Sequence, residues 1–221
     1  MRSPENESAS IVIIGSFDPT IFQPQWLGTQ ELIRPEEAEN AKIAIIQTEV
    51  ADFATEWFQL QVLQNRVTSL SADPRQYAPL RDLAAAIFTV LPYTPISALG
   101  INRHFHFKTP SNEAWHEIGH LLAPKKPWDA IMEEPELRSM LMEGHRKQVS
   151  GTTVRVKIEP SATLEYGLVV EVNEAFSPPD GQSDGVMWVP DRLTEHWDDF
   201  LGFAEEAAEH LLSLATIGYR Q

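Results

Sequence analysis

Cysteine is absent from the 221-residue chain, so disulfides, thiol catalysis and thiolate metal sites are excluded. Any metal site must use histidine, aspartate or glutamate. Glycine-rich phosphate loops are also missing, and no nucleophile-elbow glycines surround Ser16, Ser97 or Ser161. The common nucleotide-binding enzymes and serine hydrolases therefore have no local support in the sequence.

Basic residues and long apolar runs are scarce. Lys and Arg total 17 against 32 Asp and Glu, and the resulting charge of −15 repels phosphate backbones. No apolar run approaches the roughly 20 residues of a bilayer-spanning helix, and the opening MRSPENESAS contains no apolar signal segment. We therefore expect a cytoplasmic protein without a nucleic-acid or membrane partner, with a flexible N-terminus at residues 1–10.

Hydrophobic residues make up 43% of the chain, enough to form a core. In the first half, the apolar run IVIIGSF at 11–17 predicts a buried strand, and QPQWLGTQELI predicts a helix that Pro35 stops. Alternating residues between 41 and 71 predict antiparallel strands, and YAPLRDLAAAIFTVL at 77–91 predicts an amphipathic helix.

The second half repeats this order of elements. ISALGINRHFHFK at 96–108 predicts a strand, and SNEAWHEIGHLL predicts a helix capped by Ser111 or Asn112. Three more strands and a long helix from residue 190 follow. The expected fold class is α+β, with two pseudo-repeats at 11–92 and 96–221 that form one compact unit. Helices are expected on one face of a curved, mainly antiparallel sheet.

Local sequence similarities support this repeat. QWLGTQELI and AWHEIGHLL align so that Trp26 matches Trp115. The order of elements resembles the two-repeat fold of the TATA-box-binding protein family, although that family's intercalating phenylalanine pairs cannot be placed here. FDPTIFQPQWL, ADFATEWFQLQ, YAPLRDL and LGINRHFHF are similar to a sporadically distributed bacterial family of unknown function, over most of the chain. This resemblance implies no activity, catalytic residue or partner.

The segment His116-Glu117-Ile118-Gly119-His120 matches the H-E-x-x-H pattern of zinc peptidases. In such an enzyme His116 and His120 would bind zinc, and Glu117 would be the general base. However, helical spacing turns the histidines away from the apolar stripe, and the metzincin continuation with a third histidine is absent. Third-ligand candidates are Glu133, Glu134, Glu136, Glu143 and His145. We expect a packing helix without metal, and zinc hydrolysis is the alternative.

A second candidate site follows from strand alternation. If Phe105 and Phe107 face the helices, two neighbouring segments place polar residues on the open face of the sheet. These predicted binding residues are Asn102, His104, His106, Lys108, Arg155 and Lys157. Because the set is partly basic, we expect it to bind an acidic peptide or small anion, more strongly as the histidines protonate near pH 6.

Two functions are therefore carried forward. The first is a non-catalytic binding protein that holds a protein partner or acidic ligand, through the open sheet face or the acidic side of a helix. The second is a zinc-dependent hydrolase with the HEIGH helix at its centre.

Overall fold

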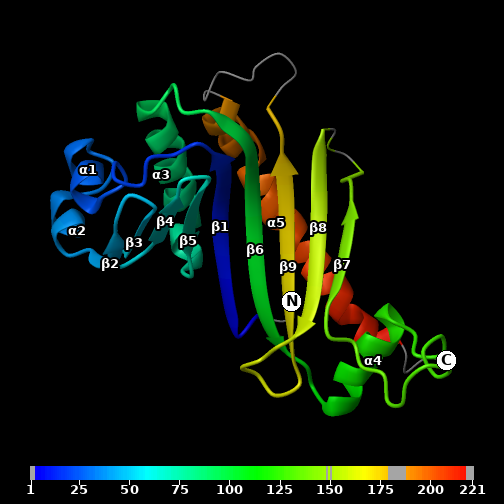
Figure 1. Cartoon of the computed structure of the whole chain (residues 1–221). Helices are drawn as coiled ribbons and strands as arrows, with labels where there is room; N and C mark the ends of the chain where they lie inside the picture. Colours follow the sequence, from blue (N-terminus) through cyan, green and yellow to red (C-terminus); the bar gives the residue numbers. More distant parts are fainter. Residues whose placement is uncertain (1–2, 148, 150, 179–187, 218–221) are drawn as a thin grey trace.

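The chain was analysed as a computed structural model that describes residues 3–147, 149, 151–178 and 188–217 (Figure 1). In these residues a mixed α+β fold is built on one nine-stranded antiparallel sheet, which confirms the expected fold class at that level. The strands are β1 (Asn6–Gly15), β2 (Lys42–Ile46), β3 (Val50–Ala54), β4 (Gln59–Leu63), β5 (Arg66–Ser71), β6 (Ile96–Lys108), β7 (Met140–Gly144), β8 (Thr152–Pro160) and β9 (Gly167–Phe176).

Five α-helices accompany the sheet in the described residues. They are α1 (Pro24–Thr29), α2 (Pro35–Glu39), α3 (Tyr77–Val90), α4 (Asn112–Leu122) and α5 (Trp188–Ile217), and a short 3₁₀ turn, η1 (Pro74–Gln76), precedes α3. None of the helices in the described part of the chain is long and apolar enough to cross a membrane.

The strand order is β2-β3-β4-β5-β1-β6-β9-β8-β7. The strands β1 and β6, which open the two halves of the sequence, pair directly in the middle of the sheet, with Ile11 opposite Ile101. One sheet therefore spans both predicted segments, 11–92 and 96–221. The short strands β2 and β7 form its two outer edges.

The core lies between one face of the sheet and helices α3 and α5, which Figure 1 shows behind the strands. Alternate residues of β1, such as Ile11 and Ile13, are about 1% exposed and contribute to this core. From α5, Trp197 and Phe200 are fully buried against it. No helix of the described residues crosses the opposite face of β1, β6, β9 and β8, so this face is open (Figure 1).

Two predicted boundaries were wrong. Strand β1 begins at Asn6 instead of residue 11, because Asn6 to Ser10 pair with β6, so most of the predicted flexible segment is strand. The first helix ends at Thr29, and Glu31 adopts a left-handed φ of 57°. Pro35 starts α2 instead of stopping a helix, since proline fits the first helical turn.

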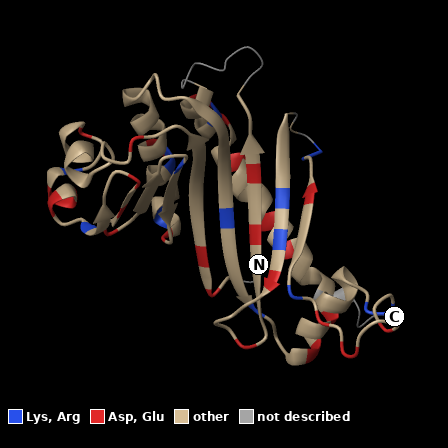
Figure 2. Ribbon diagram, viewed as in Figure 1, with Lys and Arg blue, Asp and Glu red and all other residues tan. Residues whose placement is uncertain are grey.

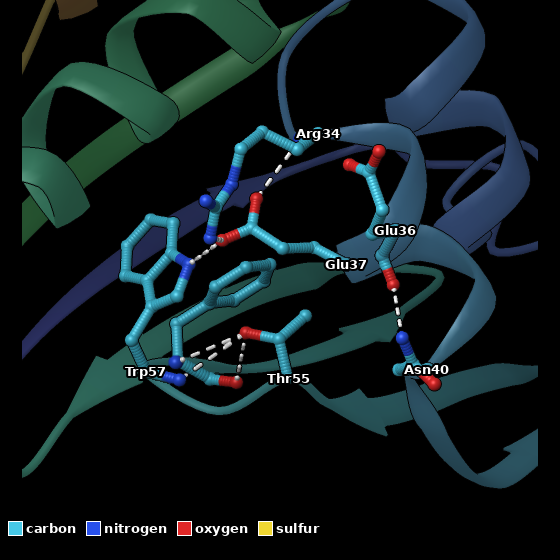
Figure 3. A network of polar contacts seen from close by, with 7 residues as sticks. Arg34, Glu36, Glu37, Asn40, Thr55 and Trp57 are labelled. Atoms are coloured by element: carbon cyan, nitrogen blue, oxygen red, sulfur yellow. Dashed lines mark hydrogen bonds and ion pairs between the residues drawn. The ribbon is translucent and has the colours of Figure 1, made fainter.

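A polar network fastens α2 to the turn between β3 and β4 (Figure 3). The Glu37 carboxylate accepts hydrogen bonds from the Arg34 backbone and guanidinium, both 2.9 Å, and from Trp57 Nε1 at 3.0 Å. Hydrogen bonding from Arg34 is the largest cause that lowers the pKa of Glu37. The carboxylate thus caps the helix and anchors it to a neighbouring element.

Candidate functional site

The predicted binding residues of β6 and β8 lie on the same, open face of the sheet. Strand β9 lies between β6 and β8, and its register aligns Asn102 with Asn173 and Arg155, and His104 with Glu171 and Lys157. Since side chains directly opposite one another in neighbouring strands share a face, these residues form two rows across the sheet. We call them the open-face ladder: Asn102, Asn173, Arg155 and Glu143 in one row, and His104, Glu171 and Lys157 in the other.

The open-face ladder is not basic, contrary to the expectation from sequence. Arg155 Nε lies 2.6 Å from Glu143 of β7, and Lys157 Nζ lies 2.9 Å from Glu159 and 3.9 Å from Glu171. Arg155 and Lys157 therefore each have a carboxylate beside them. Figure 2 shows acidic positions on β9 and β7 on either side of the basic positions of β8.

Burial disfavours the positive charge that was expected on His104 of β6. His104 Nε2 lies 3.6 Å from Glu171, too far for a hydrogen bond, and burial is the largest cause that lowers the pKa of His104. The His106 ring meets the His104 ring edge to face, with 4.8 Å between the centroids, and its Nδ1 lies 3.5 Å from Ser161 Oγ. A lowered pKa keeps His104 neutral at pH 6 more often than an ordinary histidine, so the expected gain in anion binding loses its basis there.

Of the other polar residues on this face, Asn102 and Asn173 form hydrogen bonds and Lys108 lies at the end of its strand. Asn173 donates a 2.8 Å hydrogen bond to Asn102, which in turn reaches the Ser10 backbone of β1 at 3.3 Å. Lys108 lies at the end of β6 opposite Gly167 and is exposed. The ladder is consequently a prearranged polar surface rather than a set of unpaired charges.

The HEIGH segment lies within α4, which Ser111 caps through its hydroxyl, as predicted. Ile118 is buried, while His116 is half-buried against Trp115 and His120 is exposed. The two imidazole centroids are 6.4 Å apart beside a shallow surface hollow. The helix packs against α5.

Among the residues that the structure describes, no third zinc ligand approaches this pair. Among the candidates, Glu143 is bound to Arg155, and His145 Nδ1 lies 2.8 Å from the Thr152 carbonyl. Glu133, Glu134 and Glu136 are exposed in the segment before β7. Within the described residues no group of three or more histidine, aspartate or glutamate side chains could hold a metal ion.

Two buried charges on the helix-facing side were missed by the sequence reasoning. Arg103 of β6 is 1% exposed and pairs with Glu7 and, at 3.4 Å, with Glu205. Its guanidinium also lies 4.7 Å from the ring centroid of Tyr77 and 4.6 Å from that of Phe105. The signal was present, because the alternation that buries Ile101, Phe105 and Phe107 buries Arg103 with them.

The second buried charge is Glu174 of β9, which is fully buried and accepts a 2.8 Å hydrogen bond from Thr152. Arg146, after β7, lies 3.2 Å from Glu174 and 2.7 Å from Asp199 of α5, and stacks 4.6 Å from the Phe203 centroid. Arg146, Asp199 and Phe203 also line a groove between β7 and α5.

We call this hollow the β7–α5 groove. Its volume is about 690 Å³. Its lining residues are Met142, Glu143, Gly144, His145, Arg146, Lys147, Val154, Val156, Asp198, Asp199, Gly202, Phe203 and Glu206.

Comparison with known proteins identified no relative: no family model matches the chain, and no curated protein is similar to it in sequence.

Proposed function

We propose that this chain is a non-catalytic interaction protein that holds a protein partner on the open face of its sheet. The observation that supports the proposal best is the open-face ladder, two rows of polar side chains on strands that no described helix covers. The binding residues in this proposal are those predicted from sequence: Asn102, His104, His106, Lys108, Arg155 and Lys157.

The charge pattern favours a protein partner over a small acidic ligand. A small anion needs an unpaired cation, whereas Arg155 and Lys157 already have carboxylates at 2.6 and 2.9 Å. A protein surface with its own alternating charges can match both signs of the ladder at once, which gives specificity more than affinity.

We also propose the finer architecture expected from sequence, a pair of α+β pseudo-repeats on a curved sheet like that of the TATA-box-binding protein family. The central pairing of β1 with β6 and the similar positions of these strands in the two halves support it. Membership of the sporadically distributed bacterial family stays a proposal on the residues that carry the resemblance.

Zinc hydrolysis by Glu117 with His116 and His120 remains the competing function. A catalytic zinc site requires three protein ligands and an open position for water. The described residues bring only two such ligands together on α4, so no observation favours this alternative.

A charge swap tests the proposed function. The double substitution Arg155→Glu and Glu143→Arg exchanges the two residues of one ion pair of the open-face ladder. It retains an ion pair on the exposed face but reverses the positions of the two charges. Wild-type and swapped proteins would be used as bait in lysate of the source cell, with quantitative mass spectrometry of what each retains.

The matched control is Arg192→Glu with Glu195→Arg, a 3.1 Å ion pair on α5. We expect a protein that the wild type and the control retain and that the open-face swap loses. Equal retention by all three baits, or stoichiometric zinc with peptide hydrolysis, would contradict the proposal.

A further inference from the structure

The β7–α5 groove lies on the helix-facing side of β7 and β8, and it shares the edge residue Glu143 with the open-face ladder. Met142 of β7, at 59% exposure, and Val154 and Val156 of β8 give it an apolar floor. Because β7 is the last strand of the sheet, its outer edge has no strand partner in the described residues. An apolar floor beside a free strand edge is the arrangement that binds an extended peptide by adding a strand.

The charges that α5 contributes to the groove select the kind of peptide. Both amino nitrogens of Arg146 are engaged by Glu174 and Asp199, so this guanidinium is not available to an acidic ligand. On α5, Asp198 is 84% exposed and its nearest described cation, Arg81, is 3.8 Å away. Glu206 has no ion-pair partner among the described residues, which leaves negative charge along the helix wall.

Gly202 is an independent indication that something approaches this wall. It lies within α5, where glycine costs about 1 kcal/mol relative to alanine. A Cβ at this position would meet no atom within 4 Å, so packing inside the chain does not require glycine. Because Asp198, Gly202 and Glu206 are four residues apart, they lie along one line of the helix, with the glycine between the two carboxylates.

We infer that the β7–α5 groove binds an extended basic segment of a partner protein, whose backbone pairs with β7. Alternate side chains of the segment enter the groove, where lysine or arginine residues lie over Asp198 and Glu206. Its other inward side chains contact Met142 and Phe203. This site does not depend on partner binding at the open face.

The probe is a synthetic peptide of about seven residues, long enough to cover β7, whose alternate, inward positions are lysine, valine, lysine and valine, with threonine at the positions between them. Binding of its fluorescent form is measured by anisotropy against the full chain. A peptide with glutamate in place of lysine tests charge, and one with a central proline tests backbone pairing, because proline lacks the amide hydrogen.

Three variants locate the site. Asp198→Lys with Glu206→Lys reverses the helix wall, and Glu39→Lys with Glu49→Lys is a control that changes the net charge equally in the first half of the chain. Gly202→Leu places a large side chain in the groove, at a position where an added Cβ meets no atom within 4 Å. Its control is Gly119→Leu, at an α4 glycine whose Cβ also meets nothing within 4 Å.

We expect the lysine peptide to bind the wild type and both controls, and to bind the two groove variants at least about tenfold more weakly. The glutamate and proline peptides should bind weakly to all proteins, and bound lysine peptide should slow amide hydrogen exchange in β7. The inference fails if both charge variants weaken binding equally, if Gly202→Leu retains full affinity, or if β7 exchange is unchanged. It also fails if the lysine peptide does not bind.

Discussion

Replacing Arg103 by methionine tests how the core accommodates a buried cation. Arg103 is 1% exposed, pairs with Glu7 and Glu205, and contacts the rings of Tyr77 and Phe105. Methionine keeps an unbranched apolar stem against the two rings but removes the charge and its hydrogen bonds. The variant therefore isolates the polar contribution of this residue.

The magnitude follows from the exposure of the partners. Removing one member of a fully buried ion pair costs about 3–5 kcal/mol because the other charge is left unpaired. Here the Glu7 and Glu205 side chains are 26% and 43% exposed, so both carboxylates can regain water. With about 1.5–3 kcal/mol for a hydrogen bond to a charged group, we expect Arg103→Met to lower the free energy of unfolding by about 2–3 kcal/mol.

Urea unfolding followed by tryptophan fluorescence measures this change, with Arg138→Met as a control at an 82% exposed arginine. In a double-mutant cycle, Glu7→Gln should destabilise the wild type but have little effect when Arg103 is already methionine. If Arg103→Met is as stable as the wild type, or if Glu7→Gln costs the same in both backgrounds, the ion pair does not stabilise the fold as argued.

Further predictions concern helix composition, pH and metal. Gly202→Ala and Gly119→Ala should each raise the free energy of unfolding by about 1 kcal/mol, since both glycines lie within helices and a Cβ meets no neighbour; a lower urea midpoint would contradict this. The lowered pKa of Glu37 gives stability that is present above its ordinary pKa of 4.5 and is lost as pH falls through the folded-state pKa. Glu37→Gln should therefore narrow the difference in stability between pH 6 and pH 3. Because the pKa of His104 is also lowered, its protonation opposes folding, and stability should fall as pH drops below 6.5. His104→Gln should reduce that fall, and an NMR titration should place the His104 pKa below 6.5. Protein dialysed against zinc-free buffer should retain no stoichiometric zinc, which metal analysis by mass spectrometry would check.

Alternation along single strands was enough to predict which residues share the open face. Ile101, Phe105 and Phe107 were expected inside, and Asn102, His104 and their neighbours outside, because successive side chains of a strand point to opposite faces. The charge of that face could not be predicted in the same way. It depends on Glu171 and Glu143, which reach the cations only through the strand order and register of β9 and β7.

Other features required knowledge of the tertiary structure. Pro35 fits either the end of one helix or the start of the next, and the left-handed Glu31 before it decides between them. The β7–α5 groove joins Arg146 and Asp199, which are 53 positions apart in the sequence, and no local pattern brings them together. Arg103 and Glu174 were visible as charged residues at inward positions, a pattern that indicates a buried ion pair.

Photo-cross-linking from defined positions tests the proposed interaction face most directly. Thr153 of β8 and Thr68 of β5 point to the open side of the sheet, since their neighbours Thr152 and Val67 are buried. A photoreactive amino acid at either threonine should cross-link to one and the same partner protein, while the same amino acid at Arg192 of α5 should not. Cross-links from Arg192 as frequent as those from the threonines, or none to a single partner from the open face, would contradict the account.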